Sequence, residues 1–267
     1  MTGRGRGGRA GRVRKLVVVG DSLTFYLPSD KEDPPLDDPR SMPFRMAAHL
    51  EELTGEQWSV LNLAEGGRAV FDAYNVLRRD TSARSAIAAA DAVLFAVGTK
   101  DGVLHPIPRP VRVVIGLVPK PHRGNLVHWL KPRLAKVTSR QFQMTRDRLF
   151  VRRWTGCIQI IRGLNPTAAL LCATPTREYG PQTWITFPDD WQAPDGFVAR
   201  VHALADAAGL PKVDYIAAVD EELPPIGDDW DFLHWPAEMH DIVGRRAAEV
   251  LATELASARR PLAAVAG

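Results

Sequence analysis

The stretch KLVVVGDSLTFYLP, residues 15–28, changes abruptly from an apolar run to small and polar residues. Residues 15–19 are rich in β-branched side chains and end at a glycine, a pattern that predicts a short buried strand. Asp21 and Ser22 follow at once, and both residue types commonly cap helices. A serine at a strand-to-helix turn also stands where backbone N–H groups favour developing negative charge. The stretch therefore predicts the first strand of an α/β fold and makes Ser22 both a cap and a candidate nucleophile.

The rest of the chain alternates short apolar runs with amphipathic helical patterns, which is typical of a parallel sheet covered on both faces. Further strands are expected at residues 58–63, 92–97, 168–173 and 212–215. Helices are expected at residues 43–53, 70–79, 145–162, 197–208 and 237–256. The sequence therefore predicts a three-layer α/β/α sandwich around a five-stranded parallel sheet.

The length of 267 residues and the hydrophobic content of 45% fit one large domain, expected over residues 15–258. The Gly/Arg-rich residues 1–14 lack apolar periodicity and predict a disordered basic tail, and residues 259–267 a second tail. Residues 107–140 are basic, rich in proline and too long for a simple connection. Because long excursions at strand carboxyl ends usually form lids or binding walls, this segment predicts a helical cap insertion.

The net charge of +3 hides a regional segregation. The first fifteen residues carry six Arg or Lys and no acid, and residues 107–153 carry twelve basic residues against Asp147 alone. The basic residues of the cap insertion form either a solvated face or a wall that binds anions. No motif or stacking array for nucleic acid accompanies the charge, which argues against a nucleic-acid partner.

The two cysteines, Cys157 and Cys172, have no CxxC spacing, so neither a disulfide framework nor a zinc site is indicated, and both are expected to be buried thiols. The apolar runs near the start are too short for a membrane span or a signal-peptide core. We therefore expect a cytoplasmic protein with no membrane span, no metal and no bound cofactor.

The carboxyl ends of the strands form the ligand crevice in doubly wound folds, so the residues that follow each strand are candidates for a site. The second strand is followed by NLAEGGRAV, in which Asn62 can tie loops together and Gly67 can present its N–H to an oxyanion. The third is followed by AVGTKDG, which places Lys100 and Asp101 in the same crevice. Each motif taken singly is also an ordinary turn.

Asp231 and His234 stand three residues apart in DDWDFLHWPAEMHDIVG, just before the last helix. In a loop, this spacing lets the carboxylate hold the imidazole Nδ1–H and leaves Nε2 free to take a proton from a hydroxyl. A structural role fits such a pair as well, whereas a metal site would need further ligands at suitable spacing. His240 is expected to lie on the surface or to support the site from behind.

The order and spacing of these four motifs resemble those of the SGNH or GDSL family of serine hydrolases. The resemblance implies a flavodoxin-like sandwich in which Ser22 is the nucleophile and His234 and Asp231 complete a catalytic triad. It also implies an oxyanion hole to which the backbone N–H groups of Ser22 and Gly67 contribute.

The third motif departs from the family pattern, because Lys100 stands where the family has an asparagine whose amide completes the oxyanion hole. Lys100 can replace that amide as a charged donor, or the Ser22 and Gly67 amides can suffice. The change is equally compatible with an altered reaction or an inactive enzyme. Three residues are expected to support the site: Asp21, Asn62 and Asp101.

One group within the family, the actinobacterial diglucosylglycerate octanoyltransferases of methylglucose lipopolysaccharide synthesis, resembles this chain from about residue 16 to residue 252. The shared features are VVVGDSLTFY, LDDPRSMP, the irregular third motif, the basic excursion and DFLHWPAEMH. This resemblance implies transfer of a medium-chain acyl group, octanoyl, from acyl-CoA as co-substrate to a hydroxyl of an anionic glycoside such as diglucosylglycerate, through an acyl-serine.

Two other functions fit the same residues. An SGNH esterase or thioesterase would use the triad to hydrolyse a small acyl ester, with water as the acceptor. A binding protein on the same fold would have lost catalysis altogether. The large aromatic residues near the motifs, Trp129, Trp154 and Trp235, either stack on a sugar or an acyl chain or simply pack in the core.

Overall fold

The computed structural model describes residues 12–27, 35–105, 142–177, 188–222 and 234–258, with scattered positions between 111 and 133. Residues 1–11 of the predicted basic tail and the predicted tail at 259–267 lie outside the described residues. Most of the predicted cap insertion at 107–140 also lies outside them, and so does Asp231.

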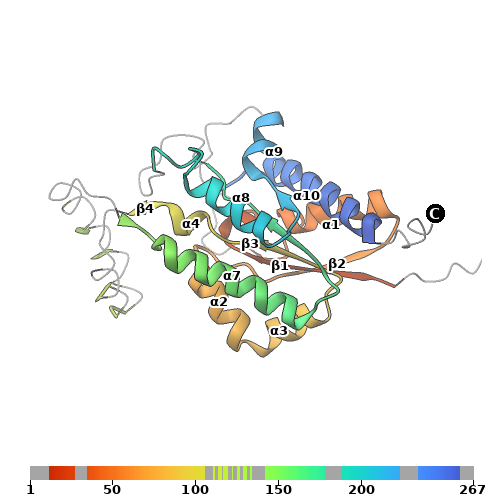
Figure 1. Ribbon diagram of the computed structural model, residues 1–267, viewed down its shortest axis with the longest axis horizontal. Helices are drawn as coiled ribbons and strands as arrows, with labels where there is room; N and C mark the ends of the chain where they lie inside the picture. The colour runs from red at the N-terminus through yellow and green to blue at the C-terminus, as the bar shows by residue number, and fades with distance from the viewer. Residues whose placement is uncertain are drawn as a thin grey trace, which may run out of the picture.

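A five-stranded parallel sheet forms the centre of the molecule (Figure 1). Its strands are β1 (Arg14–Gly20), β2 (Trp58–Asn62), β3 (Ala92–Ala96), β6 (Ala169–Ala173) and β7 (Lys212–Val213). They lie in the order β2-β1-β3-β6-β7, and each neighbouring pair is parallel. The predicted five-stranded parallel sheet is therefore confirmed. β1 pairs with strands on both sides, so the residues after Gly20 leave the sheet near its middle.

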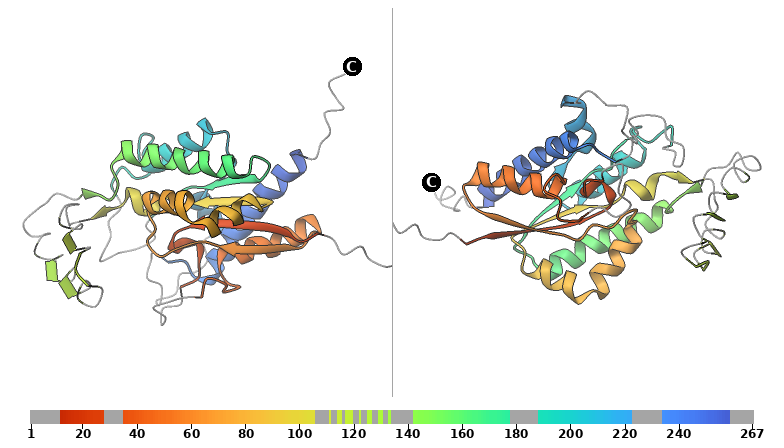
Figure 2. Two further views of the ribbon diagram at one scale, coloured as in Figure 1. Left: turned by 90° about the horizontal axis from the view of Figure 1, so that it is seen from below. Right: turned by 180° about the vertical axis from the view of Figure 1, so that it is seen from behind.

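Helices cover both faces of the sheet and make the three layers that the sequence predicts (Figure 2). One layer holds α2 (Val70–Arg79), α3 (Thr81–Ala88), α7 (Asp147–Leu164) and α8 (Phe197–Ala207). The other holds α1 (Met42–Thr54), α9 (Tyr215–Glu222) and α10 (Ala237–Ala258). Within that second layer α1 packs along α10.

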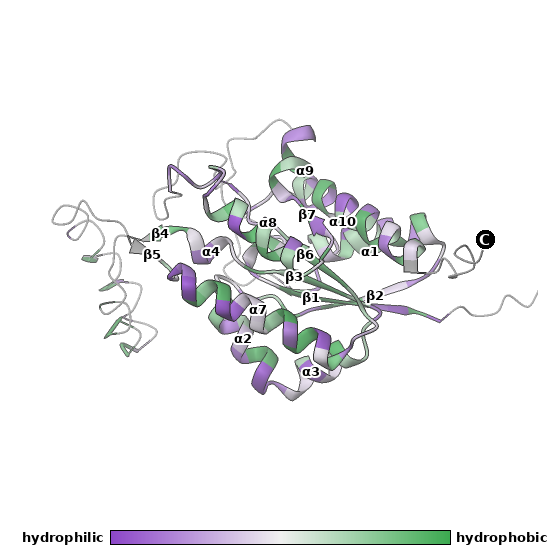
Figure 3. Ribbon diagram, viewed as in Figure 1, coloured by the Kyte–Doolittle hydropathy of each residue, from purple (hydrophilic) through white to green (hydrophobic). Residues whose placement is uncertain are grey.

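Alternation along β1 explains how one strand serves two cores. Leu16 and Val18 face the core that α1, α9 and α10 cover, whereas Val17 and Val19 face the core beneath α2, α7 and α8. All four side chains are 2% exposed or less. Hydropathy follows this arrangement, because the central strands are hydrophobic and the helices carry both hydrophobic and hydrophilic positions (Figure 3).

Three local features differ from the sequence-based expectation. The last predicted strand is shorter, because Tyr215 begins α9 instead of ending β7. A four-residue helix, α4 (Thr99–Gly102), follows β3. The antiparallel pair β4 (Leu104–His105) and β5 (Phe142–Gln143) then joins the two ends of the predicted cap insertion.

Candidate active site

The turn after β1 is built around the backbone of Asp21. Asp21 Oδ1 accepts the Leu23 N–H at 3.0 Å and caps the 3-10 helix Ser22–Thr24. The expectation that Ser22 is itself the cap is therefore wrong, because the carboxylate one residue earlier takes the free N–H. A Cβ on Gly20 would lie 2.4 Å from Thr24 Oγ1, so only glycine allows the chain to turn this tightly. The turn leaves Ser22 half-buried, as the first residue of the helix.

Asp21 is an acid in an apolar setting, with 4% of its surface exposed. Burial is the main reason why its pKa rises from 3.8 to about 7, and the negative charge of Asp101 adds to the rise. The Leu23 N–H opposes the rise, as do electrostatic interactions with His234 and Lys100. These influences show that three other predicted site residues lie close enough to Asp21 to act on its charge.

Asn62, at the end of β2, connects three segments. Its Nδ2 donates to the Thr24 carbonyl and to the Leu36 carbonyl, both at 3.4 Å. Its Oδ1 accepts the Ala64 N–H at 3.1 Å. Asn62 thereby holds the loop that follows Ser22 against the loop at residues 35–41.

Gly67 lies in the turn after β2 with a φ of 64°, a left-handed conformation that favours glycine. The Lys100 ammonium donates a hydrogen bond to the Gly67 carbonyl oxygen. A Cβ on Gly67 would lie 3.0 Å from Lys100 Nζ, so a larger residue would crowd this contact as well. The second and third sequence motifs therefore meet through Gly67 and Lys100.

Asp101 is fully buried and joins α2, α4 and the start of α7. Its Oδ2 accepts the Val70 N–H at 2.8 Å, at the first residue of α2, and its Oδ1 accepts the Thr145 hydroxyl at 2.5 Å. Burial is the main cause that raises the pKa of Asp101 to about 6, and the two hydrogen bonds and Lys100 oppose this rise. Asp101 thus acts here as a structural acceptor behind the Gly67 turn.

His234 is half-buried and lies within electrostatic reach of Asp21. Trp235 anchors this segment: it is 1% exposed, and its ring lies 4.9 Å from that of Tyr215. Asp231 falls outside the described residues, so its place in a triad stays a prediction.

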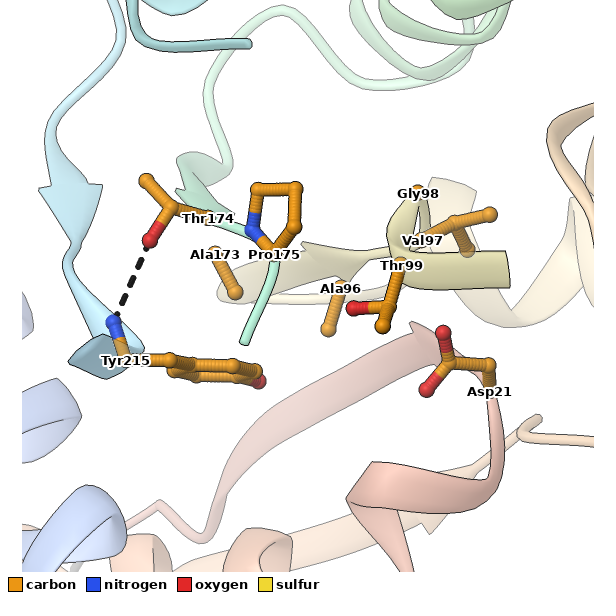
Figure 4. Close-up of a pocket in the computed structure, with 9 residues that line it drawn as sticks. All are labelled: Asp21, Ala96, Val97, Gly98, Thr99, Ala173, Thr174, Pro175 and Tyr215. Carbon is orange, nitrogen blue, oxygen red and sulfur yellow. Dashed lines mark hydrogen bonds between the residues drawn. The ribbon is translucent and has the colours of Figure 1, made fainter. Parts of the chain in front are cut away.

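A narrow pocket opens between the carboxyl ends of β1, β3 and β6 (Figure 4). Asp21, Thr99, Pro175 and Tyr215 are among its lining residues. In Figure 4 the Tyr215 ring and the Asp21 carboxyl group both point toward it. Within the described part of the chain, the buried Tyr215 hydroxyl has no hydrogen-bond partner, and burial together with the charge of Asp21 raises its pKa well above 10. Sequence reasoning missed Tyr215, because its site role depends on where α9 begins.

His240 is fully buried in α10, which excludes the surface position and leaves the supporting position that the sequence also allows. Its Nδ1 accepts the Met42 N–H at 3.3 Å, and its ring contacts those of Trp235 and Tyr26. Burial lowers the pKa of His240 to about 3, and the charge of His234 lowers it further. His240 is therefore a neutral packing residue that supports the segment carrying His234.

Other candidates for chemistry are accounted for by burial. Cys157 and Cys172 are fully buried free thiols, as predicted, and burial raises the pKa of each to about 12, which makes them inert. Trp154 and Trp235 are 1% exposed and pack in the core, whereas Trp129 is 53% exposed.

In the described ranges, no group of three His, Cys, Asp or Glu side chains is placed to hold a metal ion. No helix of the described residues is long and apolar enough to cross a bilayer.

The comparison with solved structures identifies the class of fold. A GDSL-like lipase from Parabacteroides merdae superposes with a TM-score of 0.58, at 14% sequence identity, over 90% of this chain and 96% of that one. The chain therefore has the fold of the SGNH or GDSL hydrolases. No family model matches its sequence.

Two curated proteins are similar to the chain in sequence, and both are named diglucosylglycerate octanoyltransferase. The one from Mycolicibacterium hassiacum is 29% identical over 94% of this chain and 99% of its own length. The one from Mycobacterium tuberculosis is 28% identical over 95% of this chain and 96% of its own length. These findings confirm the resemblance that the sequence motifs indicate.

Proposed function

We propose that the chain is a serine acyltransferase that moves an octanoyl group from acyl-CoA to a hydroxyl of an anionic glycoside such as diglucosylglycerate. The observation that supports the proposal is the electrostatic interaction of Asp21, the residue before Ser22, with Lys100, Asp101 and His234, which come from two other segments of the chain. Similarity to the two octanoyltransferases supports the choice of acyl group and acceptor.

In the first half-reaction, Ser22 Oγ attacks the thioester carbonyl carbon while His234 Nε2 takes the hydroxyl proton. Asp231 stabilises the imidazolium that results. The new C–O bond places negative charge on the carbonyl oxygen, where the backbone N–H groups of Ser22 and Gly67 receive it. Collapse of this intermediate breaks the C–S bond, and His234 returns the proton to the departing thiolate. Ser22 is left as an octanoyl ester.

In the second half-reaction, the acceptor hydroxyl gives its proton to His234 and attacks the ester carbonyl. The bond to Ser22 Oγ breaks, and the proton returns to that oxygen. Basic residues of the predicted cap insertion suit the phosphates of acyl-CoA and the carboxylate of a glycerate-bearing sugar. A cover that excludes water would favour transfer over hydrolysis.

The proposal is tested by following CoA release and acylated sugar over time, with octanoyl-CoA in the presence and absence of diglucosylglycerate. We expect acylated sugar to form with the acceptor, and CoA release to fall sharply without it. Ser22→Ala should abolish both signals, while an exposed serine on α3 provides a matched control, Ser82→Ala, with wild-type rates. Equal CoA release with and without acceptor, and no acylated sugar, would instead identify a thioesterase.

A further inference from the structure

Lys100 interacts with two buried acids and with the turn at Gly67. Its ammonium donates to the Gly67 carbonyl, in a turn whose φ of 64° is left-handed. Its positive charge also acts on Asp21 and on Asp101, the first at the end of β1 and the second beside it in α4. A single side chain therefore contacts or influences three of the motifs that form the site.

A neutral amide at position 100 could supply a hydrogen bond but no charge. The two acids are 4% and 0% exposed, and the charge of Asp101 acts unfavourably on that of Asp21. Two like charges in a region of low dielectric repel strongly unless a cation lies nearby. Asp101 also has to accept the Val70 N–H and the Thr145 hydroxyl, which keeps α2 and the Gly67 turn in place. A cation at position 100 therefore offsets the repulsion between the two acids, which a neutral amide cannot do.

We propose that Lys100 is a positioning residue: its ammonium holds the Gly67 turn through the Gly67 carbonyl and supplies the countercharge for Asp21 and Asp101. The Gly67 N–H is thereby fixed where negative charge develops on the acyl carbonyl oxygen. Lys100 thus acts through Gly67, and its own ammonium is not the oxyanion donor. This inference rests on the proposed serine chemistry.

The test compares three substitutions that separate the hydrogen bond from the charge. Lys100→Met removes both, Lys100→Gln keeps a donor without charge, and Lys100→Arg keeps both. Lys15→Met is the matched control, because Lys15 is exposed at the opposite end of β1. The measured quantities are the rate constant for labelling of Ser22 by a fluorophosphonate between pH 5 and 9, and kcat and KM for octanoyl transfer from octanoyl-CoA to diglucosylglycerate.

We expect Lys100→Met to lower the labelling rate constant and kcat by about 10²-fold, the effect typical of a disturbed oxyanion hole, with KM changed by less than about threefold. Lys100→Arg should recover most of this loss. Lys100→Gln should recover less of it than Lys100→Arg at low pH, because loss of the cation raises the pKa of Asp21 and moves the acid limb to higher pH. The other groups that face Asp21, namely Asp101, His234 and Tyr215, are unchanged in all variants.

Two results would overturn the inference. One is a Lys100→Met protein that labels within about twofold of wild type at every pH. The other is equal loss in all three variants with unchanged pH profiles, which would indicate a packing role alone. If Lys100→Met does not fold, the difference between the Arg and Gln variants decides in the same way. Labelling that persists in Ser22→Ala would instead refute the proposed serine chemistry, whatever the Lys100 variants do.

Discussion

The acidic side chains at the two ends of the parallel sheet lie in different environments. At the amino end, Asp91 precedes β3, and its Oδ1 accepts from Arg12 Nη2 while its Oδ2 accepts the Lys15 N–H, both at 2.9 Å. The Arg12 side chain in this ion pair is 78% exposed. At the carboxyl end, Asp21 and Asp101 are buried, and the pKa of each is raised, to about 7 and about 6.

This difference in burial indicates a structural role for the amino end of the sheet and a catalytic role for its carboxyl end. An acid paired with an exposed arginine costs little and contributes little. Burying two acids near each other opposes folding, because the charged forms lose solvation. Groups with strongly shifted pKa values gather where a site needs them, so the carboxyl end is where catalysis is expected.

The largest expected effect is on the residue that would make the carboxyl end reactive. Ser22→Ala should lower the rate of octanoyl transfer by about 10⁴-fold or more, because the proposed acyl intermediate forms on this hydroxyl. The free energy of unfolding should change little, since Asp21 makes the cap. Steady-state transfer assays and urea unfolding measure the two quantities. A variant that keeps one-tenth of the activity would contradict the catalytic role of the carboxyl end of the sheet.

A pH effect on the free energy of unfolding should arise from Asp21. Burial raises the pKa of Asp21 from 3.8 to about 7, so between these values the folded chain holds a proton that the unfolded chain has lost. The free energy of unfolding therefore falls as pH rises through this window, by on the order of 3 kcal/mol from this group. Asp21→Asn keeps a good N-cap and should remove the part of this decrease in unfolding free energy that Asp21 causes. Asp101 should still cause its own part of the decrease. Urea unfolding at pH 4, 5.5 and 7.5 tests this, and parallel curves for variant and wild type would contradict it.

A smaller loss of unfolding free energy is expected when Asp101 is replaced, because its carboxylate oxygens accept hydrogen bonds from α2 and from Thr145. Asp101→Ala leaves the Val70 N–H and the Thr145 hydroxyl without this partner and should lower the free energy of unfolding by about 2 kcal/mol at pH 7.5. Chemical denaturation with coincident circular dichroism and fluorescence gives the value. Stability equal to wild type would mean that Asp101 is not a structural acceptor.

The smallest effect on the free energy of unfolding is expected at the amino end of the sheet. Asp91→Ala removes an ion pair with an exposed arginine and one backbone hydrogen bond, and should cost about 0.5–1 kcal/mol of unfolding free energy. Octanoyl transfer by this variant should equal that of wild type. If Asp91→Ala impairs octanoyl transfer, the two ends of the sheet do not differ in role.

The fold could be predicted from the sequence because its elements carry strong local signals. The apolar runs in β1, β3 and β6 and the amphipathic spacing in α7 and α10 place those elements within about two residues of where they lie. The short elements carry weaker signals. The β4–β5 pair depends on contact between residues about forty positions apart, and the start of α9 at Tyr215 follows from packing against Trp235.

The site could be predicted in outline only. The motifs name Ser22, Gly67 and His234, because strand ends in this fold share one edge. The contact of Lys100 with Gly67 and the burial of His240 could not be read from the chain, since both depend on side-chain packing between distant segments. The positions of Asp231 and the cap insertion stay predictions.

The most direct test of the central claim is the mass of the protein after rapid acid quench of a reaction with octanoyl-CoA. The account predicts one octanoyl group per chain, located by peptide mapping on the peptide that contains Ser22, and absent from Ser22→Ala. An octanoyl group carried by another residue, or turnover of octanoyl-CoA with no acylated protein at any quench time, would contradict it.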